Sequence, residues 1–325
     1  MNKEKIKIWI KDKHNLIFLF IIILGFWIRL HYNSINSAVW WDEASYLATA
    51  KHWFFNVPYQ PNPQQAILFP LLIGMLLKIG LSENIIKLLT VLVPSLGAAI
   101  IIYFLGKEMY NNNVGLTASF IMSVFWVSIF WTARFQPDFL ALFFQLLSIY
   151  FFWTWHKHSK NRNIYYSALF LGLAFITRTQ SVLISLVYII FLIITDGLNF
   201  LKNKHVWLAS SLSFTVVLPY LIFNKIAYNN LLAFTSGYSS QVEASVPFGW
   251  YIIKFFKIYT TSDALGWIYF VFFIIGLITL IDLVLGFDMI KDNFKLRADL
   301  FNFLTAIITL VFFLFYIRVA EDRWV

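Results

Sequence analysis

Two adjacent carboxylates, Asp42 and Glu43, follow a pair of tryptophans, Trp40 and Trp41. An acidic side chain between aromatic walls can act as a general base, which takes the proton from an attacking hydroxyl. The same residues can also be structural, because tryptophans collect at membrane surfaces, Asp caps helices and Glu favours the positive end of a helix. Catalysis at Asp42 and Glu43 and this structural alternative both stay open.

The segment after the acidic pair predicts a helix on the membrane surface. Its apolar residues recur at the i, i+3, i+4 spacing of one helix face. These residues are Tyr46, Leu47, Ala50, Trp53 and Phe54. A helix with such a face lies in the interface of a bilayer.

Charged residues also lie beside later apolar blocks. Arg134 and Asp138 flank a short turn, although an Asp at the start of a helix is also an ordinary cap. Arg178 lies between two apolar blocks, where an unpaired charge costs about 2.5 to 3.5 kcal/mol or more. Its partner could be Asp138, Glu43 or the phosphate of a lipid-linked substrate, which a guanidinium binds through two hydrogen bonds.

The end of the chain carries one more cationic candidate. Arg323 stands in Glu321-Asp322-Arg323-Trp324, after an apolar block that already contains Arg318. Anchoring of these long side chains at the membrane surface is the simple alternative to substrate binding.

Composition decides what kind of element must position these residues. The chain is 60% hydrophobic and 13% charged, whereas soluble domains are about 45 to 50% apolar and 25% charged. Its apolar blocks of about 15 to 25 residues are apolar all round, which indicates membrane-spanning helices and excludes barrel strands. We therefore expect an all-α polytopic integral membrane protein, formed as one domain over residues 1–325.

Several function classes lose their usual support. With no cysteine, the chain has no disulfide, thiolate metal site or cysteine nucleophile. It has no phosphate-cradling glycine loop, zinc-protease helix or nucleophile elbow. The net charge of +9 arises from basic residues beside apolar blocks, which is typical of membrane topology and argues against nucleic-acid binding.

The apolar blocks predict about nine spans. We expect them at residues 16–31, 85–105, 114–131, 139–155, 164–178, 180–195, 206–223, 265–285 and 299–317. The block at 66–80 is short and is interrupted by Pro70 and Gly74, so we expect it to be interfacial or re-entrant.

This arrangement gathers the basic segments on one side of the membrane. They contain Lys3 to Lys13, Lys107, Lys157 to Arg162, Lys202 to Lys204 and Lys291 to Arg297. The positive-inside rule then predicts a cytoplasmic N-terminus, with the candidate site residues in external loops.

Four stretches together resemble the GT-C superfamily of membrane glycosyltransferases, in the branch similar to protein mannosyltransferases and aminoarabinose transferases. They are Trp41-Asp42-Glu43-Ala44-Ser45-Tyr46-Leu47-Ala48, Ala133-Arg134-Phe135-Gln136-Pro137-Asp138, Leu173-Ala174-Phe175-Ile176-Thr177-Arg178-Thr179-Gln180 and Glu321-Asp322-Arg323-Trp324. Their order covers nearly the whole chain. Relatives usually continue with further spans beyond the last stretch, which leaves open that this chain is a fragment.

The resemblance implies transfer of a hexosyl or pentosyl group, with inversion, from a polyprenyl-phosphate-linked donor at the outer face of the plasma membrane. The acceptor would be a protein, lipid or polysaccharide, and the fold would be the all-helical GT-C fold. By this analogy Asp42 deprotonates the acceptor, Glu43 shapes its field and Asp138 positions a substrate. Arg178 and Arg323 would hold the donor phosphate, with Arg134 and Tyr46 as further substrate contacts.

The resembled branch implies no cofactor, although other branches of the superfamily bind a divalent metal. A lipid-linked sugar flippase or transporter is the main alternative, since it also needs many helices and a few buried charges. Transporters tend to show repeated halves and broken helices in mid-membrane, and neither is evident in the sequence.

Overall fold

The computed structural model describes residues 12–33, 39–235 and 263–312, without the side chains of 263–273. These residues are mostly helical, and no strand occurs among them. The α-helices are α2 (Lys13–Tyr32), α3 (Trp41–Phe55), α4 (Leu68–Lys78), α5 (Glu83–Lys87), α6 (Val93–Met109), α7 (Asn112–Val124), α8 (Trp126–Thr132), α9 (Asp138–His158), α10 (Asn161–Thr177), α11 (Leu183–Asp196), α12 (Lys204–Tyr228), α15 (Asp263–Leu285) and α16 (Phe294–Phe312). The all-α, multi-pass membrane fold expected from composition is confirmed.

Five helical stretches in the described part of the chain are long and apolar enough to cross a membrane. They are Lys13–Tyr32, Glu83–Met109, Asp138–His158, Thr179–Lys202 and Lys204–Tyr228. The second stretch runs from α5 through one turn of π-helix, Leu88–Leu92, into α6. Each of the five coincides with an expected span.

The expected span at 114–131 is broken rather than straight. It consists of α7 and α8, which meet at an angle of 54° and together are apolar enough to form one span. The break lies at Phe125, whose backbone is extended at φ −64° and ψ 125°. The hydrophobic pattern did not reveal this break, because it continues unchanged through both helices.

The block at 66–80 forms a short helix. This helix, α4, has 11 residues and is among the apolar helices too short to span, and its interfacial or re-entrant position stays a prediction. α10 covers the expected span at 164–178, but with 17 residues it is not among the stretches long enough to cross. The last expected span is described only as far as Phe312, the end of α16.

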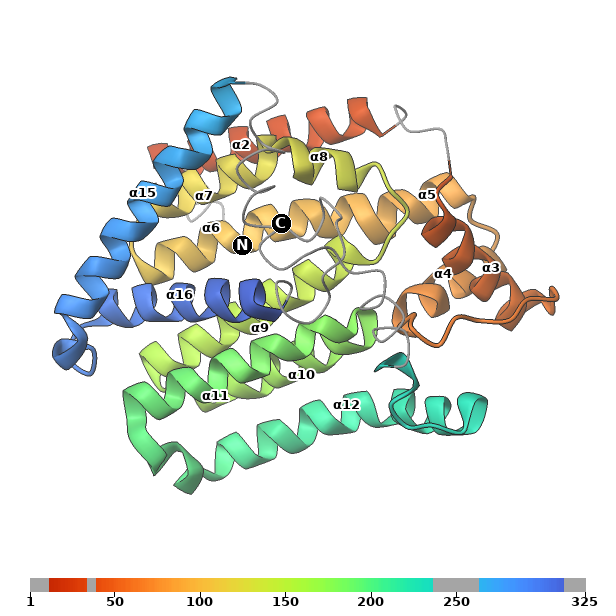
Figure 1. Ribbon diagram of the computed structural model, residues 1–325. Coiled ribbons are helices and arrows are strands. Elements are labelled where there is room, and N and C mark those ends of the chain that lie inside the picture. Colours follow the sequence, from red (N-terminus) through yellow and green to blue (C-terminus); the bar gives the residue numbers. More distant parts are fainter. Residues whose placement is uncertain (1–11, 34–38, 236–262, 313–325) are drawn as a thin grey trace, which may run out of the picture. The chain divides into compact units, whose positions relative to one another are not determined.

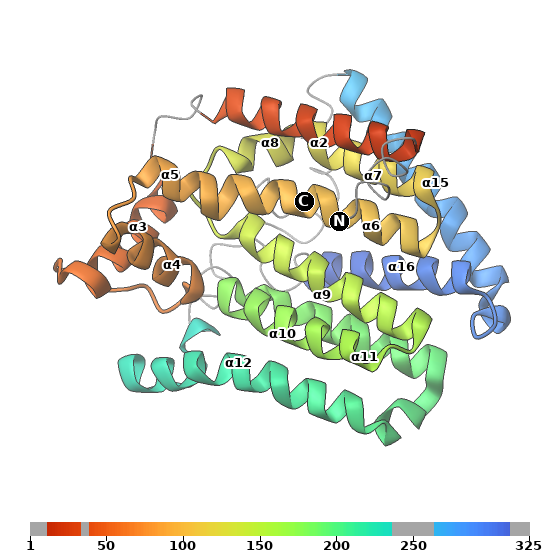
Figure 2. The same ribbon diagram turned by 180° about the vertical axis from the view of Figure 1, so that it is seen from behind.

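The chain divides into two compact units. The first comprises residues 1–182 and 204–234, and the second comprises 183–203 and 235–325. Within the first unit, α2, α7, α6, α9, α10 and α12 lie side by side in that order, and the contacts between successive helices agree with this order (Figures 1 and 2). In the second unit, α11 packs against α16 through Phe191 and Phe301.

One end of the first unit collects the segments that carry the candidate site. α3, α4 and α5 gather there, where α8 ends, α9 begins and α10 ends (Figures 1 and 2). Beneath them lies an apolar cluster that includes Ala50, Phe69, Ile73, Trp131 and Phe135. This cluster joins the surface helices α3 and α4 to the connection between α8 and α9.

The other end of the first unit is basic. Lys157 and His158, at the end of α9, both contact the carboxylate of Glu108 at the end of α6, at 3.2 Å. Tyr165 of α10 shares a 2.7 Å hydrogen bond with His205 of α12. The basic segments within this unit therefore meet at the end opposite to the candidate site, as the topology argument predicts.

Close packing of α6 on α7 leads to a first prediction. A Cβ atom at Gly115 would lie 2.4 Å from the carbonyl oxygen of Tyr103. We expect Gly115→Ala to lower the unfolding temperature in detergent by several degrees, because overpacking costs about 1 to 3 kcal/mol. Gly276→Ala is the control, since a Cβ there meets no atom within 4 Å. Equal unfolding temperatures for the two variants would contradict this account.

Candidate active site

The acidic pair lies at the start of α3. Glu43 reaches back to the helix start, and its Oε2 accepts a hydrogen bond from the backbone N–H of Trp40 at 3.3 Å. Trp40, not Asp42, is the residue that precedes the helix, so the structural alternative in which Asp42 caps the helix is wrong. Asp42 is partly exposed, whereas Glu43 is buried. The two neighbouring carboxylates therefore have different environments.

Glu43 connects two loops that are far apart in the sequence. Its Oε1 accepts a hydrogen bond from the backbone N–H of Phe135 at 3.2 Å and lies 3.7 Å from Nη1 of Arg134. The side chains of Arg134 and Glu43 are only 5% and 8% exposed. The start of α3 is thus held against the α8–α9 connection by a buried charged pair.

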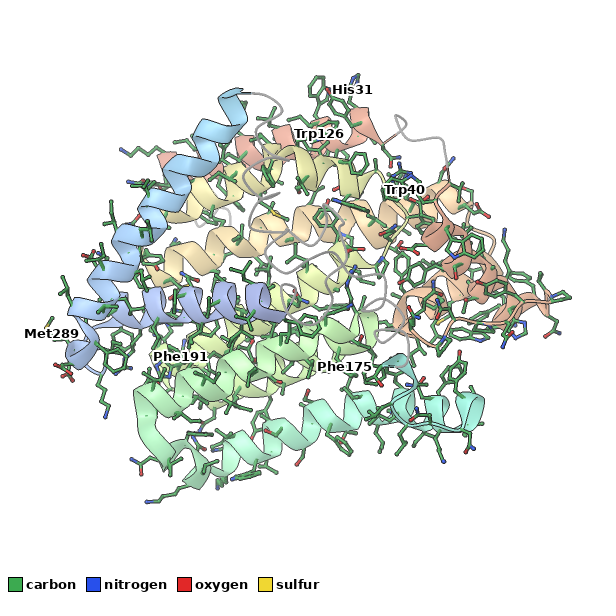
Figure 3. All side chains as sticks on the ribbon, in the orientation of Figure 1. His31, Trp40, Trp126, Phe175, Phe191 and Met289 are labelled. Atoms are coloured by element: carbon green, nitrogen blue, oxygen red, sulfur yellow. The ribbon has the colours of Figure 1, made fainter. Side chains whose placement is uncertain are left out.

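Aromatic rings enclose the guanidinium of Arg134. Its Cζ lies 3.8 Å from the ring centre of Trp40 and 5.3 Å from that of Phe130, distances at which the ring faces attract a cation. Burial lowers the pKa of Arg134 from its ordinary value, while the carboxylate of Glu43 raises it. Trp40, which is labelled in Figure 3, precedes α3 and forms one wall of this arrangement.

The helix that carries the acidic pair is held by both apolar and polar contacts. Tyr46 packs edge-on against Phe69 at 5.3 Å between ring centres. On the same helix Ser45 shares a 2.7 Å hydrogen bond with the hydroxyl of Tyr59. Ser45 is buried, which the apolar periodicity of the helix did not predict, because its partner lies in an irregular segment.

Asp138 and Arg178 form a second pair. α9 and α10 are antiparallel neighbours with a short connection, so the first residue of α9 meets the end of α10. Nη1 of Arg178 donates to Oδ1 of Asp138, and the two side chains are 17% and 25% exposed. Of the two acidic partners that the sequence left open for Arg178, Asp138 is the one that contacts it.

The turn after Arg178 is fixed by hydrogen bonds. The backbone N–H of Ser181 donates to the carbonyl of Arg178 at 3.0 Å, and its hydroxyl donates to the carbonyl of Ala174 at 3.1 Å. Gln145 of α9 donates to the same hydroxyl at 2.8 Å. Arg178 is therefore presented by a well-ordered helix end.

The structure brings most of the candidate residues to one end of the first unit. Asp42, Glu43 and Tyr46 come from α3, Arg134 from the α8–α9 connection, Asp138 from α9 and Arg178 from the end of α10. Arg323 lies outside the described residues. Substrate contacts by Tyr46 and Arg134 stay predictions.

Lys87 is a residue near this site that the sequence reasoning missed. It interacts electrostatically with both Glu43 and Arg134, and its Nζ donates to the carbonyl of Asn33 at 3.4 Å. Its position at the start of an apolar block could have been read as a membrane-surface anchor. The broken span that brings Arg134 towards it was not visible in the sequence.

The matched protein family bears on what this end of the molecule does. The model of the dolichyl-phosphate-mannose-protein mannosyltransferase family matches residues 64–223. This match covers just under half of the chain and supports a membrane glycosyltransferase of the GT-C type. No curated protein matches the chain. In this glycosyltransferase the matched segment contains Arg134, Asp138 and Arg178 and begins after the Asp42–Glu43 pair.

The glycosyltransferase shows no cluster of three or more His, Asp or Glu side chains that could hold a metal ion in its described residues. The candidate residues bring carboxylates and cations together at the site. Such a set can move a proton and stabilise a negative charge.

The buried pair leads to a second prediction. We expect Glu43→Gln to destabilise the folded protein by about 3 kcal/mol, because it leaves Arg134 buried without its carboxylate. Combining it with Arg134→Gln is expected to recover part of this loss. Chemical unfolding in detergent measures both.

Lys51 and Glu83 provide the matched control, since this pair also joins α3 to a later helix, at 2.8 Å. Their side chains are 43% and 50% exposed. Lys51→Met should therefore change stability by less than about 1 kcal/mol. If Lys51→Met lost as much stability as Glu43→Gln, burial would not explain the contribution of the Glu43–Arg134 pair to stability.

Proposed function

We propose that this glycosyltransferase transfers a sugar from a polyprenyl-phosphate-linked donor to an acceptor hydroxyl at the outer face of the plasma membrane. The reaction takes place at the end of the first unit that carries Asp42, Asp138 and Arg178. The observation that carries the proposal is the pairing of Glu43 with Arg134 and Phe135. It attaches the acidic first loop to the segment that matches the mannosyltransferase family.

Asp42 is the general base in this proposal. It takes the proton from the acceptor hydroxyl as the acceptor oxygen bonds to the anomeric carbon, and the bond from that carbon to the donor phosphate breaks. The electron pair of the broken bond stays on the lipid phosphate. Attack from the face opposite to the phosphate inverts the anomeric configuration. Asp42 suits this role because it is partly exposed, whereas Glu43 is buried.

Arg178 is proposed to bind the donor phosphate. A guanidinium matches phosphate oxygens through paired hydrogen bonds and stabilises the charge that develops on a leaving phosphate. Asp138 contacts the guanidinium and would orient it towards the donor. Arg323 is proposed to help hold the phosphate.

The charge distribution supports an external site. Lys157 and His158 mark the end of the first unit opposite to the site, and basic loops stay on the cytoplasmic side. The site end then faces outwards, where the acceptor is a protein, lipid or polysaccharide. A flippase or transporter of the same lipid-linked sugar is the second candidate function, because it would need the same phosphate contacts without a base.

The proposed base leads to a third prediction. We expect Asp42→Asn to lower the transfer rate by about 10²- to 10⁴-fold, because a positioned base contributes that much. Mass spectrometry of envelope glycans in a deletion strain would detect the lost sugar, with the native gene restoring it. Asp288→Asn is the control, because Asp288 is an exposed aspartate in the second unit.

Equal amounts of each protein in the membrane must be shown by immunoblotting. Full restoration of the sugar by Asp42→Asn would remove Asp42 from the catalytic role. If purified native protein moves the lipid-linked sugar across the membrane of liposomes without consuming it, the protein is a transporter and the proposed transferase function is wrong.

The proposed phosphate contact leads to a fourth prediction. We expect Arg178→Lys to raise the donor KM by roughly tenfold with little change in the acceptor KM, because lysine keeps the charge but loses the paired hydrogen bonds. Steady-state kinetics with a purified polyprenyl-phosphate sugar measure both constants. Lys225→Arg serves as a control, since Lys225 is exposed and contacts Asn229. An unchanged donor KM in Arg178→Lys would place the phosphate elsewhere.

A further inference from the structure

Arg29 is a buried charge that the sequence reasoning did not single out. It lies in the last turn of α2 and is 1% exposed. α2 runs alongside α7 and α8 (Figures 1 and 2), and Arg29 points into the place where those two helices meet. An ionisable residue inside a span needs hydrogen-bonding partners, because burying its charge without them is costly.

Every N–H of the guanidinium of Arg29 is used. Nε donates to Oγ of Ser95 at 3.0 Å, and Nη1 donates to the carbonyls of Gly25 and Ser123 at 3.2 and 2.7 Å. Nη2 donates to the carbonyl of Met122 and to Oγ of Ser128, both at 2.8 Å. A guanidinium has five N–H donors, so Arg29 has none left for a substrate phosphate.

The contacts of Arg29 explain the break between α7 and α8. The extended backbone of Phe125 ends α7, and the last carbonyls of a helix lose their partners in the helix itself. Arg29 donates to two of them, on Met122 and Ser123. A cation at the negative end of a helix is also electrostatically favoured. Arg29 thus supplies these two carbonyls with the hydrogen-bond donors that the backbone N–H groups of an unbroken helix would have supplied.

The same side chain also holds the start of α8. Ser128, which accepts from Nη2 of Arg29, accepts at its carbonyl a 2.7 Å hydrogen bond from Thr132 at the end of α8. Near that end, Trp131 packs edge-on against Trp40 at 5.5 Å between ring centres. Arg134 follows two residues after α8 ends. The direction of α8 therefore determines where Arg134 and Glu43 meet.

We propose that Arg29 is a positioning residue that fixes the bend between α7 and α8 and so holds the Glu43–Arg134 pair beside Asp42. The role of Arg29 in the bend follows from its hydrogen bonds to Met122, Ser123 and Ser128. Its effect on catalysis rests on the proposed transferase function. Figure 3 labels Trp126, where α8 starts, and Trp40, which precedes α3. Arg29 contacts α8 near its start, and the Glu43–Arg134 pair lies at the start of α3.

Electron paramagnetic resonance can test the bend without substrate. The chain has no cysteine, so spin labels can be attached only at introduced cysteines. Phe120→Cys on α7 and Ala44→Cys on α3 are suitable, because both positions are exposed. We expect a single narrow distance distribution for otherwise native protein. Arg29→Met should broaden or shift it, and Arg29→Lys should keep it closer to the native distribution.

A milder pair of variants covers the case in which Arg29→Met does not fold. Ser128→Ala removes only the contact of Arg29 with the α8 hydroxyl. Ser119→Ala is its matched control, because Ser119 is a buried serine on α7 with a 2.8 Å hydrogen bond to the carbonyl of Ala99 and no hydrogen bond to Arg29. We expect a changed label distance in Ser128→Ala and the native distance in Ser119→Ala.

Kinetics supply the fifth prediction, on catalysis. We expect Arg29→Met to lower kcat roughly a hundredfold, because small misplacements of catalytic groups have effects of this size. The donor KM should change little, since Arg29 has no donor left for the phosphate. Arg29→Lys should recover part of kcat, and Ser128→Ala should lower kcat several-fold.

Unchanged label distances in both Arg29→Met and Ser128→Ala would overturn the proposal, whatever the activity. So would equal losses of kcat in Ser128→Ala and Ser119→Ala, because these would reflect general packing. If native protein transfers no sugar from any polyprenyl-phosphate donor, the proposed function fails, and the label distances still decide whether Arg29 fixes the bend.

Discussion

The absence of water in the hydrocarbon layer is the constraint on which this structure depends. Any backbone carbonyl freed by a helix break and any charge moved below the surface must find its partner within the protein. The break at Phe125 and the charge of Arg29 satisfy each other, since each supplies the hydrogen-bonding groups that the other needs. A break within a span is therefore stable even where lipid supplies no hydrogen-bond partner.

The two acidic neighbours at the start of α3 show how this constraint gives adjacent carboxylates different environments. Glu43 faces inwards, where the backbone N–H groups of Trp40 and Phe135 and the guanidinium of Arg134 surround it. Asp42, one residue earlier, is partly exposed. A buried, paired charge next to a more accessible one lets the protein fix the geometry of a loop while the second carboxylate stays closer to the solvent. Loops that carry reactive groups require such support, because irregular backbone is otherwise the most mobile part of a protein.

The sequence predicted the elements better than their interruptions. The apolar blocks located the five stretches that are long enough to span a membrane and the helix α3. The basic loops at Lys107 and Lys157 indicated which helix ends lie together. The bend at Phe125 escaped because its flanking residues are as apolar as a straight span requires. The pairing of Glu43 with Arg134 also escaped, because it depends on the direction that α8 takes after the bend. Arg29 could have been found, since an arginine within an apolar block is costly unless its surroundings are built for it.

The bend between α7 and α8 has a further effect on the lipid around it. Because the two helices meet at 54°, together they reach less far across a membrane than a straight helix with the same number of residues. A bilayer adapts to such hydrophobic mismatch by thinning locally. The headgroup region is thereby drawn inwards beside these helices, so a lipid-borne phosphate meets the protein deeper than it would beside full-length spans.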